Sequence, residues 1–114
     1  MPGISGCRPV LAIVAVIGLA LVPRPAAADS SSEAVAAGHK LAGTYCADCH
    51  VVELTPKPAW NDPPPFQVTA NRPDVTAASL AAHIRKPHGK VATNARPPAE
   101  ADEIAAYILS LRRN

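Results

Sequence analysis

Two cysteines separated by two residues, with a histidine directly after the second, constrain this chain more than any other feature. The segment is Cys46-Ala47-Asp48-Cys49-His50. Thiols at this spacing can form thioethers with the two vinyl groups of a haem, and the adjacent imidazole can then lie under the iron. We therefore predict one covalently attached haem c, with Cys46 and Cys49 as attachment points and His50 as the proximal iron ligand.

Three other uses of the cysteine pair explain the sequence less well. A thioredoxin-like redox pair requires a βαβ setting, and no strand pattern occurs here. A tetrahedral zinc site usually has four ligands in paired clusters, whereas His39, His83 and His88 are scattered. A structural disulfide is compatible with an exported protein but leaves the adjacent histidine without a role. Haem attachment is the favoured interpretation.

Residues 1–28 have the plan of a secretory signal peptide. Arg8 precedes an uncharged apolar stretch, Val10–Val22, and three small residues, Ala26-Ala27-Ala28, follow it. The apolar stretch is shorter than the ~20 residues that span a bilayer as a helix. We expect cleavage after Ala28 and export of the domain 29–114 to the periplasm without a membrane span. An uncleaved membrane anchor is the alternative.

The composition of the mature domain argues against a nucleic-acid partner and for a bound group in its core. The whole chain has eleven basic and nine acidic residues, and two of the basic ones, Arg8 and Arg24, belong to the leader. The remainder is nearly neutral and has no stripe of lysine or arginine. Only one Trp, one Phe and two Tyr are available. So small a domain buries little apolar surface by itself, and a haem would supply the missing core.

Three stretches show helical periodicity, and none shows the alternation of a strand. The helices are expected over residues 32–45, over residues 77–86, and from Pro97-Pro98 to the end of the chain. Between the first two lies a proline-rich, irregular stretch, 51–75. A loop of this length is unusual in a compact domain unless it wraps around something. The fold class predicted is all-α.

Several residues have the chemistry of helix ends. Ser31 or Ser32 can cap the first helix and Thr76 the second, since a side-chain oxygen at this position accepts a backbone N–H. At the end of the last helix, Arg112 and Arg113 suit the negative end of the helix dipole.

Over nearly all of residues 29–114 the chain resembles the small class I mono-haem cytochromes c of the bacterial periplasm. The shared features begin with the attachment sequence itself and, before it, the glycine Gly38 and the aromatic residue Tyr45. Four segments after it are also shared: Pro65-Phe66, 70–73, 87–89 and 104–108. The resemblance implies the cytochrome c fold, three main helices around one haem, with the first and last helices crossing where Gly38 meets Tyr107. It also implies that a proline carbonyl, of Pro64 or Pro65, accepts a hydrogen bond from His50.

The chain departs from that family at the other face of the iron. The resemblance implies a methionine ligand shortly after the Pro-His-Gly turn, but Val91 occupies that position and the only methionine is the first residue. Three interpretations stay open. Another side chain ligates the iron, with His88 first, His83 second and Lys90 third; the iron is five-coordinate; or the haem is kept for structure alone.

The function implied by the resemblance is one-electron transfer between redox partner proteins, without enzymatic activity of its own. A second histidine ligand would give a lower potential than methionine. Two alternatives belong to other classes. A five-coordinate haem could bind a diatomic gas, and the domain could serve as the haem subunit of a larger oxidoreductase complex.

Overall fold

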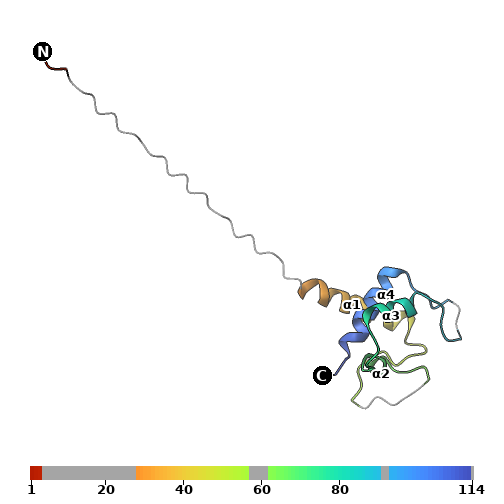
Figure 1. Cartoon of the computed structure of the whole chain (residues 1–114). Helices are drawn as coiled ribbons and strands as arrows, with labels where there is room; N and C mark the ends of the chain where they lie inside the picture. Colours follow the sequence, from red (N-terminus) through yellow and green to blue (C-terminus); the bar gives the residue numbers. More distant parts are fainter. Residues whose placement is uncertain (4–27, 57–61, 91–92, 114) are drawn as a thin grey trace.

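The computed structural model describes residues 1–3, 28–56, 62–90 and 93–113. Within these residues the chain forms helices and no strand, as Figure 1 shows. The helices are α1 (Ala28–Tyr45), α2 (Phe66–Ala70), α3 (Ala77–Ile84) and α4 (Pro98–Ser110). The all-α prediction is therefore confirmed. Most of the predicted leader lies outside the described residues, as do Val91 and Ala92. No helix in the described part of the chain is long and apolar enough to span a bilayer.

The predicted helix ends were partly wrong. Helix α1 already starts at Ala28, so Ser31 and Ser32 lie inside its first turns and do not cap it. Neither proline nor glycine occurs between Ala28 and Gly38, so nothing in the sequence prevents the earlier start. Helix α3 ends at Ile84, two residues before the predicted end. Helix α2 was not predicted, because five residues are too few to show a period.

The cap of α3 is as predicted. The Thr76 hydroxyl accepts the backbone N–H of Ser79 at 3.1 Å, and the Ser79 hydroxyl accepts the backbone N–H of Thr76 at 2.9 Å. This reciprocal capping box satisfies two donors that helix geometry leaves without partners.

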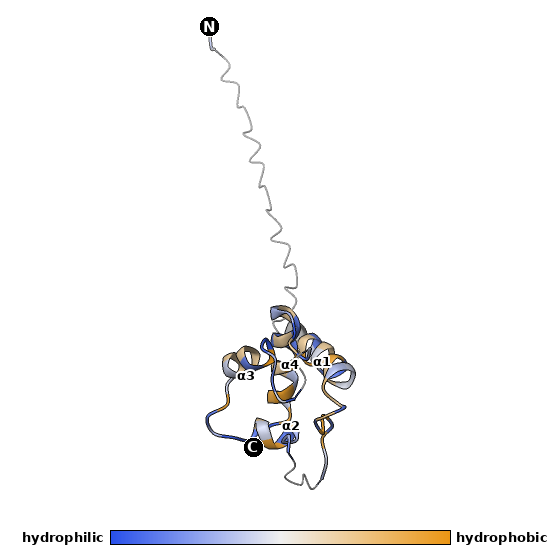
Figure 2. Cartoon of the chain, turned by 90° about the vertical axis from the view of Figure 1, so that its right-hand side faces the viewer, coloured by the Kyte–Doolittle hydropathy of each residue, from blue (hydrophilic) through white to orange (hydrophobic). Residues whose placement is uncertain are grey.

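Helix α4 is the element around which the others are arranged. It contacts α1, α3 and α2, and Figure 2 shows α1 and α3 on either side of it with α2 further along. Its face carries several of the most deeply buried apolar residues of the described chain, among them Ala101, Ile104, Ala105 and Ile108. The core therefore follows one side of the last helix, as its i, i+3, i+4, i+7 spacing indicates.

The crossing of α1 and α4 depends on Gly38. A Cβ atom at this position would overlap the carbonyl oxygen of Glu103 and would lie 2.9 Å from the Cβ of Tyr107. Only a residue without a side chain allows the two backbones to approach this closely. The predicted contact between Gly38 and Tyr107 is thus present.

Tyr107 also connects α4 to the segment that follows the cysteine motif. Its hydroxyl donates to the carbonyl oxygen of Val52 at 2.7 Å, and both residues are buried. Burial, together with the nearby Glu53 carboxylate, raises the pKa of Tyr107, so the phenol stays protonated and able to donate. The bond fixes the chain two residues beyond His50.

Replacing Tyr107 with phenylalanine is expected to lower the free energy of unfolding by about 1–2 kcal/mol. The ring keeps its packing, but the buried carbonyl of Val52 loses its partner. Denaturant unfolding of the haem-loaded protein measures the change, and the visible spectrum should stay that of the wild type. A variant with unchanged stability would contradict this assignment.

Arg112 and Arg113 have a different role from the one predicted. Helix α4 ends at Ser110, before both arginines. Arg112 donates from Nε to the carbonyl oxygen of Ala70 at 2.8 Å and from Nη2 to that of Val75 at 3.0 Å. The Arg113 backbone N–H donates to the side chain of Asn71 at 2.9 Å. The C-terminus therefore binds the α2 segment to α4, and so gives order to part of a stretch that lacks periodicity.

Candidate haem-binding site

A cavity of about 1080 Å³ opens between the four helices. It exceeds the roughly 300–1,000 Å³ typical of small-molecule sites. Each helix contributes lining side chains, most of them apolar: Tyr45, Phe66, Thr69, Leu80, His83, Ile84, Ile104 and Ile108. A large, flat and mainly apolar group fits these walls, and the domain's own side chains leave the space unfilled.

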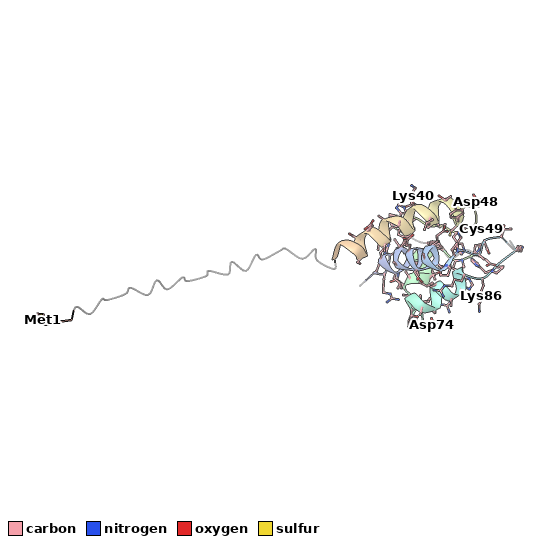
Figure 3. All side chains as sticks on the ribbon, turned by 90° about the horizontal axis from the view of Figure 1, so that it is seen from above. Met1, Lys40, Asp48, Cys49, Asp74 and Lys86 are labelled. Atoms are coloured by element: carbon pink, nitrogen blue, oxygen red, sulfur yellow. The ribbon has the colours of Figure 1, made fainter. Side chains whose placement is uncertain are left out.

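The cysteine motif continues directly from the end of α1. The backbone N–H of Cys46 donates to Ala42 at 2.9 Å, and those of Cys49 and His50 donate to the Cys46 carbonyl at 3.1 and 2.9 Å. This extra turn brings Cys46, Cys49 and His50 to the wall of the same cavity. Figure 3 labels Cys49 beside Asp48 at this end of α1.

The two cysteines are both free thiols, so the structure contains no disulfide between them. They differ in environment, because Cys46 is half-buried and Cys49 is exposed. Burial raises the pKa of the Cys46 thiol, while the positive charge of Arg96 opposes this shift. Both cysteines line the cavity.

The imidazole of His50 is held by its neighbours. Its Nδ1 donates to the carbonyl oxygen of Pro64 at 2.9 Å, and its ring lies 5.2 Å from that of Phe66. Pro64, and not Pro65, is thus the acceptor that the sequence left undecided. Because Nδ1 donates this hydrogen bond, Nε2 is the nitrogen free to bind a metal. A histidine that binds a metal through one ring nitrogen is usually oriented by a hydrogen bond from the other.

His88 lines the same cavity, and hydrogen bonds orient both its ring and its backbone. Its Nδ1 donates to the carbonyl oxygen of Lys86 at 2.9 Å, which again leaves Nε2 free. The side chain of Asn94 binds the backbone of His88 twice, since it accepts the His88 N–H at 3.0 Å and donates to the His88 carbonyl at 2.7 Å. Sequence reasoning missed Asn94, because no local pattern predicts a contact across six residues.

The two lower-ranked candidate ligands, His83 and Lys90, line the cavity as well. The rings of His83 and His88 lie 4.4 Å apart. Burial lowers the pKa of His83, and the neighbouring His88 and His50 add to this effect. Within the described residues the His83 ring makes no hydrogen bond that would orient it. Lys90 follows Gly89, whose φ of 65° forms a turn that favours glycine.

His39 is not brought to the cavity. Its ring stacks on that of Tyr107 at a centroid distance of 4.7 Å, and its Nε2 lies 2.7 Å from a carboxylate oxygen of Glu53. In the part of the chain that the structure describes, no group of three or more histidine, cysteine or acidic side chains could hold a metal ion.

Comparison with known proteins gives one clear relative. The chain is 42% identical over 97 residues to cytochrome c-552 of Bradyrhizobium diazoefficiens, and the alignment covers 83% of this chain and 93% of that protein. No protein-family model matches the chain, and no solved structure matches it.

Proposed function

This chain belongs to the small class I c-type cytochromes and carries covalently bound haem c, and from that premise we propose that it is a one-electron carrier of the periplasm. Cys46 and Cys49 form the thioether bonds, and His50 is the proximal iron ligand. When bound, the haem supplies a one-electron couple between ferric and ferrous iron. The chain itself performs no further chemistry and exchanges electrons with redox partner proteins.

The observation that carries this proposal is the convergence of the motif on one cavity. Two sulfur atoms and an imidazole, all from a single turn, meet apolar side chains from every helix. Pro64 holds His50 by its Nδ1, which both orients the ring and increases the basicity of Nε2. The apolar walls keep water from the buried side of the site.

We propose His88 as the second iron ligand. Its ring is oriented by the same device as that of His50, a hydrogen bond from Nδ1 to a backbone carbonyl. His83 has no equivalent bond among the described residues. Two histidine ligands favour a low-spin iron that changes little on reduction, which suits electron transfer, and they lower the potential relative to methionine ligation.

The leader 1–28 is proposed to direct export and to be removed after Ala28, which leaves the domain 29–114. The small residues before the cleavage site and the short apolar stretch support this assignment. The intact mass of the protein recovered from the periplasm tests it together with haem attachment.

Replacing Cys46 and Cys49 together with serine is expected to abolish covalent attachment. Serine hydroxyls do not add to the haem vinyl groups, so the variant should lose the mass increment of the haem and its stain after denaturing electrophoresis. Cys7→Ser is the matched control, because Cys7 lies in the leader and should not affect the mature protein. A double variant with the haem mass of the wild type would overturn the attachment assignment.

Electron transfer is tested by absorption spectra of the ferric and ferrous protein before and after addition of carbon monoxide. A low-spin spectrum that carbon monoxide changes only slowly supports the carrier function. A high-spin spectrum that shifts with carbon monoxide would overturn it and would assign the protein to the gas-binding haem modules.

A further inference from the structure

We propose that Arg96 is a positioning residue for the distal iron ligand. It fixes the segment that carries Asn94, and Asn94 in turn holds His88 at the cavity. The inference rests on the proposed role of His88 and adds to it the residue that keeps this ligand in place.

Arg96 joins parts of three helices, through its side chain to α4 and α1 and through its backbone to α3. Its Nε and Nη2 both donate to one carboxylate oxygen of Glu100 in α4, at 2.8 and 2.6 Å. Its guanidinium carbon lies 3.7 Å from the ring centre of Tyr45, the last residue of α1. Its backbone N–H donates to the carbonyl oxygen of Ile84, the last residue of α3, at 2.9 Å. Charge-assisted hydrogen bonds and cation–π contacts are among the stronger polar interactions when partly shielded from water.

The connection from Arg96 to His88 passes through Asn94. Asn94 lies two residues before Arg96 and lines the cavity. Its amide binds both the N–H and the carbonyl of His88, so the backbone of His88 cannot leave without breaking two bonds. The position of Asn94 is determined by where the chain is anchored, and Arg96 is the nearest anchor.

A second arginine, at the end of α3, also pairs with an acidic residue of α4 but is more exposed. Arg85 makes a single contact with Asp102 at 3.2 Å, and its side chain is 45% exposed. The Arg96 side chain is only 18% exposed and has two partners, the Glu100 carboxylate and the Tyr45 ring. Exposed ion pairs contribute little, so loss of the Arg85 pair should leave His88 in place.

The consequence of losing Arg96 is more frequent departure of His88 from the iron. Each departure opens the distal position to a small ligand that competes for it. Carbon monoxide reports this directly, because it binds only ferrous iron with a free position.

The experiment measures carbon monoxide association with the ferrous haem-loaded protein by stopped flow. Arg96→Gln should associate about tenfold faster than wild type, whereas Arg85→Gln should match wild type. Both variants should remain low-spin without carbon monoxide. Glu100→Gln keeps the shape of the partner of Arg96 and removes its charge, so it should shift the association rate in the same direction. This variant replaces Arg96→Gln in the test if Arg96→Gln does not fold.

Denaturant unfolding of the same variants separates positioning from general stability. A lower unfolding midpoint for Arg96→Gln with an unchanged association rate would overturn the inference while leaving His88 as ligand. If the wild type itself is high-spin, or if His88→Ala matches the wild type, the distal-ligand proposal fails and the inference fails with it.

Discussion

His88→Ala is expected to convert a low-spin haem protein that binds carbon monoxide only slowly into a high-spin one that binds it rapidly. Alanine has no atom that can ligate iron, and the cavity on that side then offers only side chains that are less well oriented. The ferric spectrum should gain high-spin character, and the reduction potential should rise because a strong donor is lost. Absorption spectra and stopped-flow mixing with carbon monoxide measure both the change in spin state and the ligand binding.

His83→Ala is the matched control for this prediction. The two rings are in contact and line the same cavity, so a general disturbance of the pocket would affect both variants alike. Only the His88 variant should leave a free coordination position on the iron. If the His83 variant frees this position and the His88 variant does not, the ligand is His83, and the hydrogen bond from His88 to Lys86 has only a structural role.

Gly38→Ala is expected to destabilise the folded protein by about 3 kcal/mol or more, near the upper end of what a single methyl group costs in a packed site. The new Cβ would overlap the Glu103 carbonyl oxygen, so α1 and α4 would have to separate. The gain in helix propensity, about 1 kcal/mol, does not offset this. For a domain of this size the melting temperature should fall by roughly 15 °C.

Gly43→Ala provides the control on the same helix. A Cβ at Gly43 meets nothing within 4 Å, so the substitution should keep most of the propensity gain and stabilise the protein slightly. Thermal unfolding of the two haem-loaded variants compares them directly. Equal melting temperatures would show that the close approach at Gly38 tolerates a methyl group and does not determine the crossing.

The predictable parts of the site are those made by residues close together in the sequence and those implied by the family resemblance. Cys46, Cys49 and His50 follow one another in the chain, so a single turn determines their common direction. The contact of Gly38 with Tyr107 joins two helices, and only the resemblance indicated it. The choice between Pro64 and Pro65 depended on a loop path that no local pattern specifies.

The remaining features could not be predicted, because they arise from tertiary contacts between irregular segments. The two bonds of Asn94 to His88 join residues on either side of a turn. Arg96 pairs with the nearby Glu100, but its contacts with Tyr45 and Ile84 reach far back in the sequence. Arg112 was assigned to the dipole of its own helix, a local argument, whereas its donors reach carbonyls about forty residues earlier. Such interactions are chosen by the final packing and leave no periodic signal.

The cavity at the centre of the fold also has a consequence for how this protein is made. All four helices present apolar side chains to a space that no side chain fills, so the polypeptide without its cofactor lacks the middle of its own core. A chain this small has little other buried surface with which to compensate. We therefore expect folding to depend on cofactor attachment: the polypeptide without haem should be largely unfolded, with both thiols accessible, and should acquire its tertiary structure as the haem is joined to it. Supply of the cofactor, more than the intrinsic stability of the polypeptide, would set how much of this protein a cell accumulates.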